Sequence, residues 1–270
     1  MPKTSLRLGK PLPDRRTLLA LQVLVLLGFF GLWWVLTWSR LLDPFFFATP
    51  GAVLARTWTD MVVTGVIWPH LGITLLETVL AFAIGTAAGI VLGFWFARAP
   101  LVSAVFDPYI KAANALPRVV LAPIFALWLG LGIWSKVALG VTLVFFIVFF
   151  NVYQGVREVS PVLLANARML GMGPRHLLRH VYLPSALSWV FSSLHTAVGF
   201  ALVGAVVGEY LGAAAGIGYL IAQAEGVFDT DGVFSGMLIL TVFVLVIDAL
   251  VSLVERRLLR WRPSAAGSQA

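Results

Sequence analysis

The sequence predicts an all-α, polytopic membrane protein with about six transmembrane helices, and three observations support this fold class. Of the 270 residues, 60% are hydrophobic and 11% are charged, whereas about a quarter of a soluble domain is charged. The mean hydropathy is +0.95. Uncharged apolar runs of about 20 residues, the length that crosses a bilayer, recur along the chain. We therefore expect lipid to be the solvent for most of the surface.

The apolar runs define the six predicted spans in order. The first, Thr17–Ser39, is uncharged and too long for a signal-peptide core, so we interpret it as a retained helix. The third is short, and Gly130, Gly132 and Lys136 mark the turn between it and the fourth. The remaining predicted spans are Thr78–Ala97, Val119–Ser135, Val137–Val156, Val181–Gly208, and Gly232–Ile247 with its continuation to Val254.

The lysines and arginines indicate the orientation of these spans. Most of them lie before the first span or after the second, fourth and sixth, and the opposite side carries Arg40, Arg56 and Lys136. Because cytoplasmic loops carry the basic excess, both termini are predicted to be cytoplasmic. The net charge of +7 is then a topology signal with affinity for anionic membrane lipid. We expect no nucleic-acid partner.

These boundaries divide the chain into a basic cytoplasmic segment (1–16), a single transmembrane domain (17–258) and a cytoplasmic C-terminal tail (259–270). The loop from Arg40 to His70 is too polar to span a membrane. Within it, Thr49 and Pro50 predict the N-cap and first residue of a short amphipathic helix on the outer membrane surface.

Glycines four residues apart predict close helix packing. They form two stripes, Gly85, Gly89 and Gly93 in the second span, and Gly204, Gly208, Gly212 and Gly216 in the fifth and its exit. Small residues at this interval let another helix approach closely. Beyond Gly212 we expect irregular backbone, which is tolerated at membrane depth where protein or water surrounds it.

A stripe of polar residues precedes the third span. It consists of Asp107, Lys111, Asn114 and Arg118, which share one face of a helix by their spacing. Two interpretations are open: a solvated or headgroup-facing stripe, or the lining of the cytoplasmic part of a transport pathway.

Four other titratable residues lie near membrane depth. Glu209, at the outer end of the fifth span, is predicted either to act as a gate or substrate contact or to cap a helix of a neighbouring subunit. Glu77 and Asp248 are expected to face the bundle interior or an interface, because charges facing lipid are costly. His195 is expected to be a hydrogen-bonded core residue.

The segment between the fourth and fifth spans predicts two short helices at the cytoplasmic surface. Ser160 and Pro161 are suited to the N-cap and first position of one helix, and Gly171 to its left-handed C-terminal cap. Pro174 can begin a second helix, and Pro184 the next span. The result is a rigid, basic, amphipathic element presented to the cytosol.

This segment, about 158–184, resembles the signature loop of ABC-importer permeases. That pattern is Glu-Ala-Ala, three residues, Gly, nine residues, Ile-x-Leu-Pro. Gly171, Val181 and Leu183-Pro184 match it with the spacing intact, and Ala165-Asn166-Ala167 replaces Glu-Ala-Ala without its leading acid. The resemblance implies a coupling helix that docks on an ATPase subunit through Ala165, Asn166, Ala167, Arg168, Gly171, Leu183 and Pro184.

The resemblance extends from about Pro44 to Arg262 and is greatest to the nitrate/sulfonate/taurine-type permeases. Matching stretches include Leu129-Gly130-Leu131-Gly132 and Val207-Gly208-Glu209. It implies a homodimeric permease in the bacterial cytoplasmic (inner) membrane, a cytoplasmic ABC ATPase dimer that holds ATP-Mg, and an extracytoplasmic solute-binding protein. The implied solute is a small oxyanion such as nitrate, a sulfonate or taurine.

Other motifs bear on the function class. The chain has no phosphate-binding Gly-x-x-x-x-Gly-Lys-Ser/Thr loop, no zinc-binding His-Glu-x-x-His motif and no cysteine. We therefore predict no enzyme activity, catalytic residue, metal site or cofactor in this chain. A channel or secondary carrier, and less favourably a membrane-embedded enzyme, stay open as alternatives. A carrier would usually show an internal repeat, and none is evident between the two halves.

Overall fold

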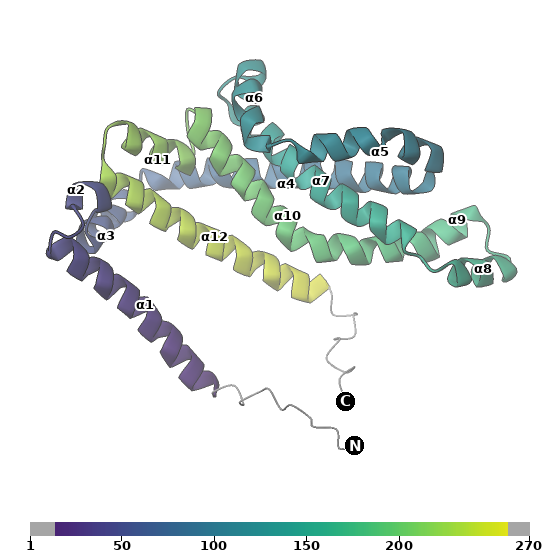
Figure 1. Ribbon diagram of the computed structural model, residues 1–270, viewed down its shortest axis with the longest axis horizontal. Coiled ribbons are helices and arrows are strands. Elements are labelled where there is room, and N and C mark those ends of the chain that lie inside the picture. Colours follow the sequence, from purple (N-terminus) through teal and green to yellow (C-terminus); the bar gives the residue numbers. More distant parts are fainter. Residues whose placement is uncertain (1–13, 259–270) are drawn as a thin grey trace, which may run out of the picture.

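The computed structural model describes the backbone of residues 14–258. The predicted terminal segments therefore lie largely outside the described residues, at 1–13 and 259–270. The side chains of Leu183 and Pro184 also lie outside the described part. Every element within residues 14–258 is a helix, which confirms the all-α fold class (Figure 1).

Five helices are long and apolar enough to span a membrane by themselves within the described residues. They are α1 (Arg15–Trp38), α4 (Ile67–Arg98), α7 (Ile133–Arg157), α10 (Leu183–Gly212) and α12 (Thr230–Leu258). Each corresponds to a predicted span. α4 begins well before the predicted Thr78, because the helix continues through the polar residues around Glu77.

The predicted third span, Val119–Ser135, has the wrong bounds, because its helical segment ends at Leu129 and is too short to cross a membrane alone. The chain instead forms α5 (Pro100–Ala115), a short 3-10 helix η2 (Arg118–Leu121) and α6 (Ala122–Leu129), with a bend of 86°. Pro117 favours extended backbone in the preceding residue, and Leu116 has a ψ of 133°. Gly130, at a φ of 76°, then ends α6, and Ser135 belongs to α7. The bent pair can serve as the sixth span.

The core of the bundle consists of α4, α7 and α10, which lie side by side (Figure 1). Five of the predicted stripe glycines lie at these contacts, because Gly85, Gly89 and Gly93 of α4 and Gly204 and Gly208 of α10 all face α7. Gly212 and Gly216 lie beyond them, near α6 and Glu209. A Cβ atom on Gly89 would lie 2.8 Å from the Cβ of Val148, and Gly204 faces the backbone of Gly140 equally closely. Because only glycine permits such an approach, these stripes set the distance between the helices.

Short helices cover the outer end of the bundle. They are α2 (Pro44–Phe47), α3 (Pro50–Trp58), the π-helical turn η1 (Thr59–Val63) and α11 (Ile217–Gly226). The predicted cap is present, because the Thr49 hydroxyl accepts a hydrogen bond from the backbone N–H of Ala52 at 3.3 Å. Val53 is buried and Trp58 is exposed, so α3 is amphipathic as expected.

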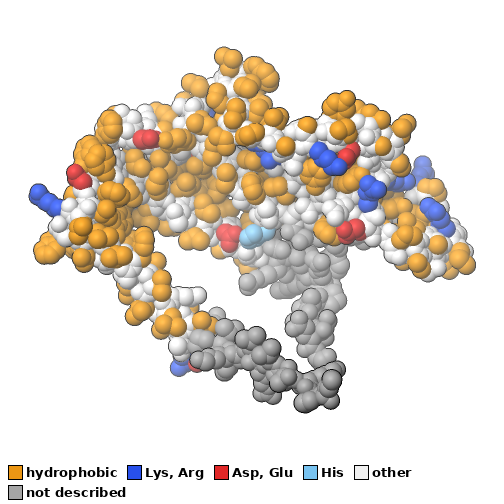
Figure 2. Space-filling view, in the orientation of Figure 1, with side chains coloured by type: hydrophobic (Ala, Val, Ile, Leu, Met, Phe, Trp, Pro, Cys, Tyr) orange, Lys and Arg blue, Asp and Glu red, His pale blue; other side chains and the backbone are white. Residues whose placement is uncertain are grey.

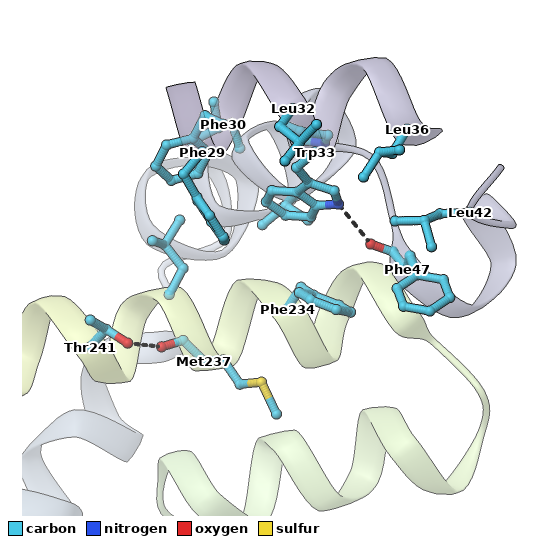
Figure 3. A pocket seen from close by; sticks show the side chains of 14 residues that line it. Phe29, Phe30, Leu32, Trp33, Leu36, Leu42, Phe47, Phe234, Met237 and Thr241 are labelled. Carbon is cyan, nitrogen blue, oxygen red and sulfur yellow. Dashed lines mark hydrogen bonds between the residues drawn. The ribbon is translucent and has the colours of Figure 1, made fainter. Parts of the chain in front are cut away.

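The helix α1 contacts the rest of the chain near its C-terminal end (Figure 3). There, the Trp33 indole N–H donates to the carbonyl of Phe47 at 3.3 Å, and its ring lies 5.7 Å from that of Phe234. An apolar cavity of about 460 Å³ lies between α1, α3 and α12. Along the remainder of α1, apolar side chains such as Val25 are exposed, as expected for a lipid-facing helix.

The ends of the helices agree with the predicted orientation. The C-terminal ends of α4 and α7 lie near the start of α10, at the end of the molecule that carries the segment between α7 and α10 (Figure 1). In Figure 2, hydrophobic side chains cover most of the visible face, and Lys and Arg side chains gather towards that end. We assign this basic end to the cytoplasm.

Candidate functional site

The segment between α7 and α10 forms a helix with a well-defined C-terminal cap. α8 (Pro161–Met169) ends at Gly171, which has a φ of 79°. The backbone N–H of Met172 donates to the carbonyl of Ala167 at 3.1 Å, and that of Gly171 to Arg168 at 2.9 Å, which together form a Schellman motif. At the other end, Pro161 is the first residue as predicted, but the Ser160 side chain makes no capping hydrogen bond.

The second predicted short helix is continuous with the fifth span. α9 (Pro174–Leu177) is followed without a break by the π-helical turn η3 (Leu178–Tyr182) and by α10. Pro184 therefore lies in the first turn of α10 and does not follow a loop. Since the helical run is uninterrupted from Pro174, a displacement of α8 needs to pass only a short turn to reach α10.

α8 presents most of its surface outwards. Among the predicted coupling residues, Ala165, Asn166, Arg168 and Gly171 are exposed, whereas Ala167 is buried. Met169 and Leu170, beside them, are large apolar residues with exposed fractions of 85% and 79%. Exposed apolar side chains next to a buried anchor are typical of a surface that binds a protein partner.

The predicted polar stripe is only partly on one helix. Asp107, Lys111 and Asn114 lie on α5, and Lys111 Nζ is 2.6 Å from Asp107 Oδ2. Arg118 lies beyond the bend at Pro117, so the expected single helix face ends before it. Its guanidinium nevertheless turns back, donates to Asn114 Oδ1 at 2.5 Å and lies over the ring of Phe146. The stripe is therefore continuous through side-chain contacts, and its α5 part is exposed.

Glu209 belongs to a buried polar cluster at the outer end of the bundle. The Thr74 hydroxyl donates to Glu209 Oε1 at 2.7 Å, and the backbone N–H of Gly218 donates to Glu209 Oε2 at 2.8 Å. The carboxyl of Glu77 lies near that of Glu209, and Lys136 is the cation that faces both. Glu77, Lys136 and Glu209 are each at most 2% exposed.

The cluster fixes the start of α11 against α4 and α10. Besides Gly218, the backbone N–H of Gly216 donates to His70 Nδ1 at 2.9 Å, and that of Ile217 donates to the Thr74 hydroxyl at 3.1 Å. Side chains thus satisfy three consecutive N–H groups that a helix start leaves unpaired. Glu209 caps a helix of its own chain, which differs from the predicted cap of a neighbouring subunit. Its role as a gate or substrate contact stays a prediction.

Sequence reasoning missed Lys136 and Thr74 as members of this cluster. Lys136 was interpreted as a separator between two spans, but its ammonium group points inwards and donates to the carbonyls of Leu131 at 2.5 Å and Gly132 at 3.1 Å. Charge could have identified Lys136 as a member of the cluster, since Glu77, Lys136 and Glu209 are all ionisable residues at membrane depth. Glu77 faces the interior as predicted.

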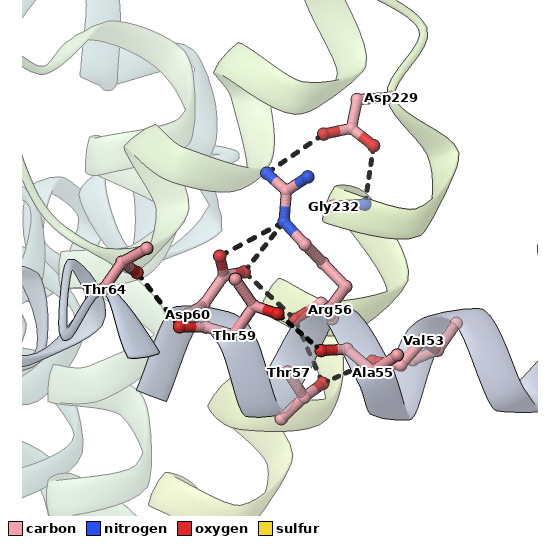
Figure 4. Close-up of polar contacts among 10 residues, drawn as sticks. Val53, Ala55, Arg56, Thr57, Thr59, Asp60, Thr64, Asp229 and Gly232 are labelled. Carbon is pink, nitrogen blue, oxygen red and sulfur yellow. Dashed lines mark hydrogen bonds and ion pairs between the residues drawn. The ribbon is translucent and has the colours of Figure 1, made fainter. Parts of the chain in front are cut away.

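Two further polar side-chain contacts connect α12 to its neighbours. At the outer end, Arg56 lies 3.1 Å from Asp60 and 3.2 Å from Asp229, and so joins α3 to the turn before α12 (Figure 4). At membrane depth, His195 Nε2 lies 2.7 Å from Asp248 Oδ1, between α10 and α12. Both residues of this second pair are partly exposed, so His195 is not the core residue that was predicted.

The sequence matches a known protein family and known relatives. Residues 85–260 match a protein family described as binding-protein-dependent transport system inner membrane components. The chain is 29% identical over 268 residues to the aliphatic sulfonates transport permease SsuC of Bacillus subtilis, covering 99% of this chain and 97% of the relative. It is 33% identical over 232 residues to the formylaminopyrimidine transport permease ThiX of Halalkalibacterium halodurans, covering 85% and 91%.

The fold also resembles a solved structure. An inward-facing conformation of the MetNI methionine ABC transporter matches with a TM-score of 0.54 at 18% identity, covering 77% of this chain and 95% of that chain. At this identity, the match supports the fold of the helical bundle alone. The family match covers the C-terminal part of α4 from Gly85, the polar stripe, α7, α8 and α10.

Proposed function

We propose that this chain, which belongs to the family of binding-protein-dependent transport system inner membrane components, forms one half of a homodimeric solute pathway. As a member of that family, it is the multi-pass membrane subunit of an ABC importer in the bacterial inner membrane. The family implies a cytoplasmic ATPase and an extracytoplasmic solute-binding protein as partners. The ATPase, not this chain, would hold ATP-Mg and hydrolyse it.

The junction of α8 with α10 supports a role for this chain in coupling ATP hydrolysis to transport. α8 has an exposed face and a fixed C-terminal cap, and a short turn joins it to a helical run that continues through α10 to Gly212. Closure of the ATPase dimer on α8 would therefore tilt α10 against α4 and α7. Such a tilt would open the pathway to alternate sides of the membrane.

An exposed polar surface on α5 supports pairing with a second copy of this chain. The α5 part of the polar stripe is exposed, with the Lys111 side chain 68% accessible. Charged groups facing lipid are costly, and a two-fold interface lined by α5 would remove them from lipid. The same arrangement would place Lys111 and Arg118 along a shared cytoplasmic pathway.

The proposed solute is a small oxyanion, with an aliphatic sulfonate as the leading candidate. The relatives are named for different solutes, aliphatic sulfonates in one and a formylaminopyrimidine in another. Arg118, which has no carboxylate partner among the described residues, favours an anion among these choices. We expect the binding protein to set most of the specificity, since it delivers the solute.

The coupling role can be tested in liposomes that contain the chain, its ATPase and its binding protein. Inverting the order of residues 165–171 should leave the protein in the membrane and ATP hydrolysis measurable, but reduce uptake of radiolabelled ethanesulfonate to background. Gly173→Ala is the matched control, because Gly173 lies beside α8 with a φ of −72° and no atom within 4 Å of an added Cβ. Unchanged uptake by the inverted variant would contradict the coupling role.

The solute class can be tested in the same liposomes. Uptake of ethanesulfonate should exceed that of a neutral analogue of similar size, such as dimethyl sulfone, by at least tenfold. If the complex carries only neutral or cationic solutes, the oxyanion proposal is wrong while the coupling role is unaffected.

A further inference from the structure

A basic pocket lies between the cytoplasmic end of α4 and the coupling segment. Its volume is about 370 Å³. One wall comes from the last residue of α4, and the other from α8 and the chain that follows it. The lining residues are Arg98, Arg168, Met172, Pro174, Leu177 and Tyr182.

The two arginines of this pocket have no carboxylate partner in the described part of the chain. By contrast, Arg56 and Lys111 are each paired with an aspartate. The local sequence offers no acid either, because no Asp or Glu occurs between Glu158 and Glu209. Two arginines that line one pocket without an acid among its lining residues create a site for an anion.

The position of the pocket indicates that its ligand comes from the membrane. Arg98 ends the long apolar helix α4, and Tyr182 immediately precedes α10, so both lie at the boundary between hydrocarbon and cytosol. The Arg98 guanidinium is held there over the ring of Tyr182, 5.5 Å from its centre. Met172 and Leu177 add an apolar wall. An amphiphile with an anionic head fits this combination of polar and apolar walls better than a hydrated cytosolic anion does.

We propose that this pocket binds the phosphodiester headgroup of an anionic phospholipid. Arginine forms paired hydrogen bonds with phosphate oxygens, and basic pockets between helices at the cytoplasmic surface recognise such headgroups. One headgroup held by Arg98 and Arg168 connects α4, a helix of the core, to α8. Anionic lipid thereby fixes the resting position of the coupling helix.

The test uses the full chain, purified in a neutral detergent, and dihexanoylphosphatidylglycerol as the probe. The substitution pair R98Q/R168Q should weaken binding of this probe roughly 10- to 30-fold, since each direct contact of an arginine with the phosphate contributes about a factor of five. The control pair R175Q/R179Q removes the same charge from exposed positions of the same segment that do not line the pocket. It should change binding less than threefold.

A second pair, R98K/R168K, keeps the charges and should bind the probe within about fivefold of the unsubstituted chain, which preserves the test if the glutamine pair fails to fold. Equal weakening by the two glutamine pairs would overturn the proposal, as would equal binding of dihexanoylphosphatidylcholine. Inorganic phosphate that competes at the same concentration as the lipid probe would assign the pocket to a free anion instead. Displacement of the lipid by the purified ATPase would assign the arginines to a carboxylate of that partner.

Discussion

Replacing Lys136 with methionine tests how the outer end of the bundle is held together. Methionine preserves most of the apolar stem, which packs against Gly208 of α10, but it removes the ammonium group. That group donates to two backbone carbonyls and faces the carboxyl groups of Glu77 and Glu209. The substitution therefore leaves two buried acids without their cation and two carbonyls without a donor.

The expected loss of stability follows from this burial. Lys136 is 1% exposed, and removing one partner of a buried charge cluster costs about 3–5 kcal/mol. For a domain of this size, each kcal/mol corresponds to roughly 2–4 °C, so we expect the melting temperature to fall by about 6–20 °C. The same substitution at Lys111, whose side chain is 68% exposed, should cost less than about 0.5 kcal/mol.

Thermal unfolding of the detergent-purified chain, followed by loss of the monodisperse peak in size-exclusion chromatography, measures both variants. If Lys136→Met melts within 2 °C of the unsubstituted chain, Lys136 does not balance the acids and our description of the cluster is wrong.

Three other predictions concern packing and the proposed pathway. Gly216→Ala should lower the melting temperature, because Gly216 has a φ of 114° and an added Cβ would overlap the carboxyl of Glu209. The control Gly226→Ala should leave the melting temperature unchanged, because no atom lies within 4 Å of an added Cβ there. Gly89→Leu should prevent α4 from packing on α7 and abolish the folded peak, whereas Gly72→Leu, where no atom lies within 4 Å, should be tolerated. Lys111→Gln should reduce ethanesulfonate uptake at least threefold while Lys111→Arg retains it, and equal uptake by both would remove Lys111 from the pathway.

The sequence predicts most of this fold because each single-helix span corresponds to a long run of apolar residues. Thr17–Ser39 has no charge and forms α1 almost residue for residue. The glycine spacing of Gly85, Gly89 and Gly93 likewise reports the contact with α7 directly. The length of an apolar run and the spacing of glycines are local properties of the sequence, so they can be interpreted without knowledge of the tertiary structure.

The third span was mispredicted because hydropathy does not indicate the direction in which a helix runs. Pro117 and Gly130 indicated breaks in the helix, but the bend of 86° depends on how α6 packs against α7 and α10. The same bend displaces Arg118 from the face of α5, although its hydrogen bond to Asn114 restores the contact.

The buried cluster could be predicted only in part, because its members come from four helices. The turn between Gly212 and Ile217 folds α11 back onto α4, and this places Glu209 at the start of a helix of its own chain. Neither that turn nor the inward direction of Lys136 is recorded in local sequence. The coupling segment, in contrast, is contiguous, and the first residues Pro161 and Pro174 and the C-terminal cap at Gly171 were predicted correctly. The Ser160 side-chain cap and a separate helix start at Pro184 were not.

The central claim is that movement of α8 reaches α10 through the continuous run of α9, η3 and α10. The most direct test inserts Gly-Gly-Ser between Leu178 and Arg179, inside η3, and measures ethanesulfonate transported per ATP hydrolysed in liposomes with the ATPase and binding protein. Since α8 is untouched, we expect the ATPase to co-purify and hydrolysis to stay within twofold, while transport per ATP falls at least tenfold. Unchanged transport per ATP would show that α8 and α10 are not mechanically linked by this run, and would contradict the account.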